Sequence, residues 1–137
     1  MPRFITVDLD VRSTPRSSLD SLSKALTAFG TVQNDHRDAQ GQFVSFALGE
    51  SHETIESTIS ALISAIDQLD SEARSEWTSA ASRVFNVGIE AGREPDRPII
   101  TLDAELVAAA AHHGAGVTFT HYPCHDRNAG FSHTTIA

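Results

Sequence analysis

Residues 4–11 read FITVDLDV, and this stretch decides the fold because apolar and polar side chains alternate along it. One side carries four aliphatic residues, Ile5, Val7, Leu9 and Val11. The other side carries Phe4, Thr6, Asp8 and Asp10. A period of two is typical of a strand with one face on a core and the other face open. The stretch therefore predicts a half-buried strand.

The residues that follow predict a helix and two more strands. Four apolar residues recur at helical spacing: Leu19, Leu22, Leu26 and Phe29. They predict a helix over residues 18–29, with Ser17 or Ser18 as N-cap and Gly30 as C-terminal stop. Residues 31–38 (TVQNDHRD) are polar and fit an edge strand, while residues 42–49 (QFVSFALG) predict a second clear strand.

The second half of the chain predicts two more helices and two more strands. A long apolar stripe predicts a helix over residues 52–70, capped by Ser51, and Trp77 either closes this segment or begins another short helix. Residues 82–92 (SRVFNVGIEAG) form a strand, and residues 92–98 form a loop rich in proline and glycine. Asp103 caps a helix over residues 104–113, which ends at Gly114, and residues 117–122 (VTFTHY) form the last strand.

The order of these elements predicts an α+β domain. Its first six elements match the split β-α-β arrangement called ferredoxin-like, which has a mainly antiparallel sheet with helices on one face. The last helix and strand would extend this sheet. We expect a single domain over residues 1–123 and a C-terminal tail over residues 124–137.

Composition narrows the classes of function. The 137 residues are 40% hydrophobic, which is enough for one core. The sequence has no run of eighteen apolar residues, so it predicts no membrane span. The N-terminus does not read as a signal peptide, and a single cysteine fits a reducing cytoplasm. The net charge of −8 disfavours nucleic-acid binding and favours a cationic partner.

Residues 82–123 resemble a family of small bacterial domains of unknown function. The matching stretches are SRVFNVGIEAG and ITLDAELVAAAAHHGAGVTFTHYP: a strand that ends in an acid, a capped helix, a glycine, and a strand that ends near Tyr-Pro. Members of that family resemble immunity proteins, each of which binds one toxin and blocks it. The resemblance implies a non-enzymatic binding protein in the cytoplasm, without catalytic residues or a cofactor. The doubled His112–His113 and the tail after Pro123 depart from the pattern.

Acidic residues are the candidate contacts for a toxin with a basic surface. They are Asp8, Asp10, Asp70, Glu72, Glu76, Glu90, Glu94 and Asp96. Asp8 and Asp10 share one face of the first strand, where paired carboxylates can bind a cation or act as acid and base. The acids from Asp67 to Glu76 are expected to end the long helix, where they would oppose its dipole.

Histidines and the single cysteine near the C-terminus offer an alternative. His121, Cys124 and His125 form H-x-x-C-H, whose side chains can bind zinc, although the spacing matches no familiar zinc motif. His112 and His113 are consecutive on a helix and point about 100° apart, so they cannot both face one ion. We expect no bound metal. There are two alternatives to a binding protein. One is a metal-dependent enzyme that uses Asp8, Asp10 and these histidines, and the other is a ligand-sensing ferredoxin-like module.

Overall fold

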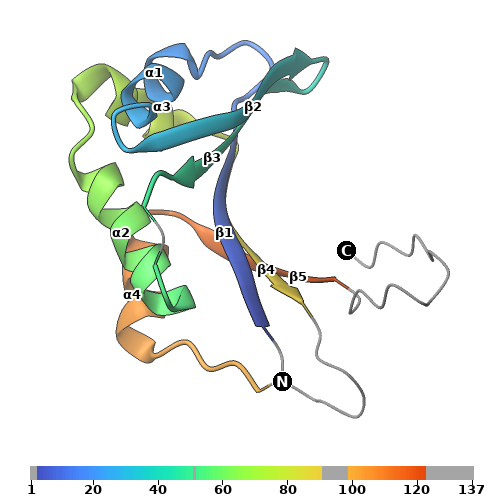
Figure 1. Cartoon of the computed structure of the whole chain (residues 1–137). Coiled ribbons are helices and arrows are strands. Elements are labelled where there is room, and N and C mark those ends of the chain that lie inside the picture. The colour runs from blue at the N-terminus through green and yellow to red at the C-terminus, as the bar shows by residue number, and fades with distance from the viewer. Residues whose placement is uncertain (1–2, 51, 91–98, 123–137) are drawn as a thin grey trace, which may run out of the picture.

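The computed structural model describes residues 3–50, 52–90 and 99–122. Its strands are β1 (Arg3–Arg12), β2 (Gly30–Asp38), β3 (Gly41–Leu48), β4 (Ser82–Glu90) and β5 (Gly116–Tyr122). Its helices are α1 (Asp20–Leu26), α2 (Ile55–Asp67), α3 (Ser71–Ser79) and α4 (Ala104–His112). The strands form one sheet in the order β2-β3-β1-β4-β5, and the helices lie to one side of it (Figure 1).

The sheet confirms the predicted α+β class. β1 is antiparallel to both of its neighbours, β3 and β4, and β2 is antiparallel to β3. Only β4 and β5 run parallel, because α4 connects them as a crossover. The arrangement of the first four strands is compatible with a ferredoxin-like fold, and α4 and β5 extend the sheet beyond β4.

The alternation of FITVDLDV separates the two faces of the sheet as predicted. Val7, Leu9 and Val11 are at most 2% exposed and lie in the core, whereas Asp8 and Asp10 are half-buried on the other side. The core also takes large side chains from the two neighbouring strands and from the long helix, among them Phe46, Phe85, Leu62 and Ile66. In the register, Leu9 is opposite both Phe46 and Phe85, which joins three strands under the helices.

The first helix is shorter than the predicted range of 18–29. Its N-cap is Leu19, which makes no side-chain cap, so neither Ser17 nor Ser18 holds that position. The hydroxyl of Ser18 instead accepts a hydrogen bond from the Asp20 N–H at 3.0 Å. Gly30 does not end this helix, because the helix stops at Leu26 and Gly30 begins β2. The prediction was therefore correct for the helix and wrong for both of its ends.

The long helix predicted over residues 52–70 is α2, which is shorter at both ends, and Trp77 lies in a separate short helix, α3, which was one of the two predicted alternatives. Thr54, not Ser51, caps α2, because its hydroxyl and that of Ser57 form a reciprocal capping box. Asp70 ends the helical run because its side chain accepts a hydrogen bond from the N–H of Ala73 at 2.9 Å and so begins α3. Asp70 therefore lies at a helix N-terminus, where the dipole favours an acid, contrary to the expectation.

The last helix follows the sequence closely. Asp103 caps α4 as predicted, through a 2.8 Å hydrogen bond from the N–H of Leu106. The helix ends beside Gly114, whose φ of +72° lies in the left-handed region that glycine adopts readily. The chain then turns into β5, so that α4 contacts both β5 and α2.

Candidate functional site

The side of the sheet opposite the helices is not covered by any helix that the structure describes (Figure 1). Strand alternation and register give this side Thr6, Asp8, Asp10 and Arg12 from β1, Phe43 and Ser45 from β3, Val84, Asn86 and Gly88 from β4, and Thr118 and Thr120 from β5. We call these residues the open face. They bring the two strongest acidic candidates of the sequence, Asp8 and Asp10, to the middle of the sheet.

Asp10 lies at the centre of a hydrogen-bond network that crosses four strands. The hydroxyl of Ser45 donates to one carboxylate oxygen of Asp10 at 2.7 Å, and the amide of Asn86 donates to the other at 3.3 Å. The hydroxyl of Thr120 donates to the carbonyl oxygen of Asn86 at 3.0 Å. All of these donors are neutral, so the network fixes the Asp10 carboxylate in place and leaves its charge uncompensated.

Asp8 is the more unusual acid. Burial raises the pKa of Asp8, the charge of Asp10 raises it further, and a 3.3 Å hydrogen bond from Thr6 only partly offsets them. Among the described residues no cation pairs with Asp8 or Asp10, because Arg12 on the same strand turns to Asp38 at 3.1 Å. The open face therefore holds two neighbouring carboxylates that an external cation would stabilise.

The other predicted acids do not join this pair. Glu76 and Glu72 lie on α3 and contact α1: Glu76 accepts a hydrogen bond from the Leu22 N–H at 2.7 Å, and Glu72 accepts one from the Ser21 hydroxyl at 3.4 Å. Asp70 is the cap of α3. These three acids thus have local structural partners on the helical side of the molecule.

Glu90 is the last residue of β4 and is half-buried. Its position in the alternation of that strand, four residues beyond Asn86, places it toward the end of the open face. Glu94 and Asp96, the other two predicted partner contacts, lie outside the described residues.

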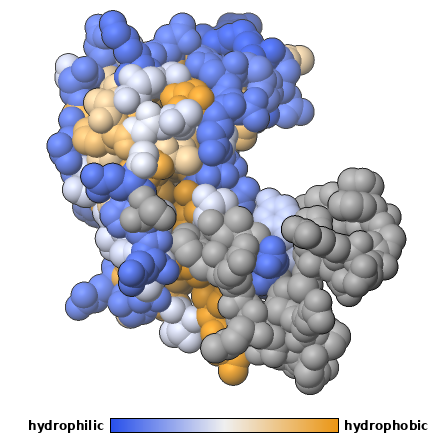
Figure 2. Space-filling view, in the orientation of Figure 1, coloured by the Kyte–Doolittle hydropathy of each residue, from blue (hydrophilic) through white to orange (hydrophobic). Residues whose placement is uncertain are grey.

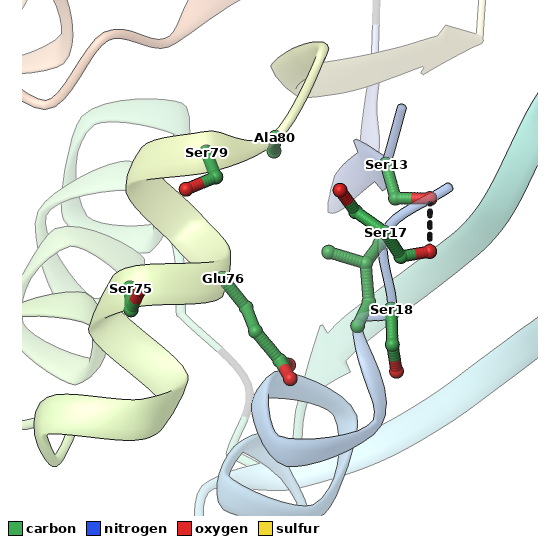
Figure 3. Close-up of a pocket in the computed structure, with 8 residues that line it drawn as sticks. Ser13, Ser17, Ser18, Ser75, Glu76, Ser79 and Ala80 are labelled. Carbon is green, nitrogen blue, oxygen red and sulfur yellow. Dashed lines mark hydrogen bonds between the residues drawn. The ribbon is translucent and has the colours of Figure 1, made fainter. Parts of the chain in front are cut away.

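A polar hollow of about 260 Å³ lies between α3 and the segment that leads into α1 (Figure 3). It is lined by Ser13, Ser17, Ser18, Leu19, Ser75, Glu76, Ser79 and Ala80. Glu76 extends across it toward the start of α1, and the Ser13 hydroxyl donates to the Ser17 carbonyl at 3.2 Å. Glu76 is the only acidic or basic side chain among these lining residues, and its carboxylate accepts a hydrogen bond from the Leu22 N–H, so its contact in the structure is with the backbone of α1.

His112 and His113 diverge as predicted. His113 turns to α2, where its Nε2 lies 2.7 Å from Asp67 Oδ1, while its Nδ1 lies 2.8 Å from the Ala109 carbonyl oxygen. His112 is exposed. Burial lowers the pKa of His113, but the hydrogen bonds to Asp67 and Ala109 outweigh it, and the net effect is a raised pKa.

The alternative metal ligands do not converge in the described part of the chain. His121 pairs with Ile89 in the register, on the same side as Val117 and Phe119 as predicted, which is the side opposite Asp8. Cys124 and His125 lie outside the described residues. Within residues 3–50, 52–90 and 99–122, no three histidine, cysteine or acidic side chains are grouped as a metal site would require.

Sequence reasoning missed the neutral members of the open face. Asn86 could have been noticed, because it alternates with the apolar Phe85 and Val87 and must therefore face away from the core. Ser45 carries the same signal, between Val44 and Phe46, but the proximity of any of these residues to Asp10 depends on the strand order and register.

No protein-family model, no curated protein and no solved structure matches this chain. The resemblance of residues 82–123 to small bacterial domains therefore stays a prediction. None of the helices that the structure describes has the length and apolar character needed to cross a membrane. The chemistry of the open face is thus the basis on which a function can be argued.

Proposed function

We propose that this protein is a non-enzymatic binding protein of the immunity type. In this proposal it acts in the bacterial cytoplasm, needs no cofactor, and neutralises a cognate protein toxin by covering its active site or basic surface. The observation that carries the proposal is the pair Asp8 and Asp10, held on the open face without a described cation.

The energetics of Asp8 support a contact with a cationic partner. Its raised pKa means that folding disfavours the ionised carboxylate, so at neutral pH this side chain lowers the stability of the domain. A lysine or arginine of a partner would remove that penalty, because a charge-assisted hydrogen bond favours the ionised form. A charge that is kept at a cost to stability is typical of a functional position.

The area of the open face also bears on a protein partner. The open face spans four strands at about 4.8 Å spacing, each with about seven residues at 3.3 Å, and so covers roughly 450 Å². A standard protein interface buries roughly 800 Å² on each side, so the open face supplies about half of that area and its rim would have to supply the rest.

The test compares two charge-removing substitutions, Asp8→Asn and Glu53→Gln, in association with the protein encoded beside this gene. Both remove one negative charge, but Glu53 is exposed ahead of α2, away from the open face. We expect Asp8→Asn to slow association, measured by stopped flow, and to weaken its dependence on salt, whereas Glu53→Gln changes neither. Asp8→Asn should also raise stability at neutral pH, by up to about 1 kcal/mol, which excludes unfolding as the cause.

Three outcomes would contradict the proposal. A neighbouring gene product that is not toxic, or that this protein neither binds nor neutralises on co-expression, would remove the immunity function. Equal association rates for the two variants would remove the open face as the contact surface. About one equivalent of divalent metal on the purified protein, lost on Asp8→Asn, together with turnover of a substrate, would favour the metal-dependent enzyme instead.

A further inference from the structure

The two edges of the sheet have opposite characters. The β2 edge carries Asp35, His36, Arg37 and Asp38, and Figure 2 shows hydrophilic residues around the β2–β3 hairpin. The β5 edge, with the sequence GVTFTHY, contains no acidic residue, lysine or arginine. Charged side chains on an edge strand prevent pairing with another strand, and their absence permits it. Among the described residues no strand lies beside the outer edge of β5.

The helix beside β5, α4, has an exposed apolar flank that faces outward, past the edge of the sheet. Its other flank carries His113 and Ala109, which face α2 through the contact with Asp67 and so point toward the middle of the sheet. At 100° per residue, Val107 lies on the opposite flank, which points outward past β5. Val107 is 50% exposed, one of the few large hydrophobic side chains exposed in the described structure.

The rest of the outward flank is small and uncharged. At helical spacing from Val107 it consists of Ala104 and Ala111, both of which are exposed. Glu105 and His112 lie on other sides of the helix by the same geometry. The uncharged edge strand and the apolar helix flank therefore form one continuous surface, which we call the β5 edge surface.

We propose that two copies of this chain associate through the β5 edge surface. The β5 strands pair antiparallel about a two-fold axis, which continues the sheet from one copy into the other, and the Val107 flanks of the two α4 helices pack against each other across the axis. Strands in a sheet lie about 4.8 Å apart and packed helices about 8–10 Å apart, so neighbouring β5 strands bring the helices above them within packing reach.

Charge selects a second copy as the occupant. A chain of net charge −8 repels its own copies, and the β5 edge surface contributes no acid to that repulsion. A basic partner would gain nothing there, since the surface offers it no acid. A two-fold interface is self-complementary, so one uncharged surface with unpaired backbone groups serves both copies.

The test is the mass of the full chain in solution. Sedimentation equilibrium over about 1–200 µM should give twice the 14.7 kDa of one chain at the upper end of this range. Val107→Glu and Thr118→Glu each place like charges across the axis, and both change exposed side chains. We expect each to raise the dimer dissociation constant at least about tenfold.

Thr31→Glu is the matched control, because it makes the same change at an exposed position of the other edge strand, β2. It should leave the dissociation constant unchanged. Hydrogen exchange of the β5 amides supplies a second readout on the unmodified chain: their protection should rise with protein concentration.

A single-chain mass throughout the concentration range would overturn the proposal. So would a dimer that Val107→Glu and Thr118→Glu leave intact, or β5 amides whose protection does not depend on concentration. Val107 lies on α4, on the helical side of the sheet, and is not part of the open face, whereas Thr118 is. Loss of dimerisation in Val107→Glu therefore leaves the toxin-binding test unaffected, and the failure of either proposal can be told from the failure of the other.

Discussion

The contact between His113 and Asp67 makes the stability of the domain depend on pH. It joins the ends of α4 and α2, with 2.7 Å between His113 Nε2 and Asp67 Oδ1. Nδ1 of the same ring donates to the Ala109 carbonyl, so both ring nitrogens face oxygen acceptors. The cationic imidazolium, which donates from both nitrogens, is the form that this geometry favours. Arg74, on α3, opposes the cation only in part.

The sign of the pH dependence follows from the raised pKa of His113. The stabilisation is complete below the pKa that histidine has in the unfolded chain, about 6.5, and is lost as the pH rises through the higher pKa of the folded protein. The His113 side chain is 13% exposed but that of Asp67 is 59% exposed, so solvent screens the pair. We therefore expect about 1 kcal/mol, near the upper end for exposed pairs.

The substitution Asp67→Asn removes the charge and keeps a side chain of the same size. It should destabilise the domain by about 1 kcal/mol at pH about 5.5, which corresponds to a fall of about 3–5 °C in the melting temperature. At pH about 8.5 the cost should vanish, or become a gain of about 0.3 kcal/mol, because an acid at the end of α2 opposes the helix dipole.

Urea denaturation followed by Trp77 fluorescence measures this directly. Trp77 is the chain's only tryptophan, and its indole N–H donates to the His113 carbonyl at 3.1 Å, so it reports on the same junction. Taking the difference between the two proteins at each pH cancels the titration of the other histidines. An equal difference in unfolding free energy at both pH values would refute the reasoning.

Two further predictions concern packing, both checked by urea denaturation midpoints. Gly30→Ala should cost about 2–4 kcal/mol, because the new Cβ would clash with the Ala47 carbonyl oxygen of the neighbouring strand. Gly116→Ala meets nothing within 4 Å and should stay within about 0.5 kcal/mol. Arg83→Lys should lower the free energy of unfolding by about 1–2 kcal/mol. The Arg83 guanidinium donates to four backbone carbonyls and lies 5.8 Å from the centre of the Trp77 ring, and a single ammonium group cannot make all of these contacts. Equal costs for the two glycine changes, or an unchanged midpoint for the arginine change, would contradict these expectations.

The sequence predicted what depends on local periodicity. The alternation along residues 4–11 separated the core face from the open face, because neighbouring side chains of a strand point to opposite sides. Asp103 and Gly114 marked the ends of α4, since a cap and a left-handed glycine act on the residues beside them. Even the polar stretch 31–38 was correctly placed as an edge strand.

Errors arose where one residue interrupts a pattern that otherwise continues. The apolar stripe runs past Asp67 to Leu69, so it predicted a helix as far as residue 70, yet α2 ends at Asp67 and the side chain of Asp70 caps the next helix. The start of α1 was predicted wrongly for a different reason. The backbone N–H of Leu22, near that start, donates a hydrogen bond to Glu76, which lies 54 residues further along the chain. No local sequence pattern can show such a partner.

The acidic residues look alike in the sequence but have different surroundings in the structure. Some acids satisfy helix N-termini, as Asp70 and Asp103 do. Others pair with cations, as Asp67 does with His113. Asp8 does neither: its surroundings disfavour its charge, and within the described residues only a threonine hydroxyl favours it. Net charge alone favours a partner surface in the acidic middle of the chain, around α3, whereas the cost of keeping Asp8 ionised is the reason that we propose the open face instead.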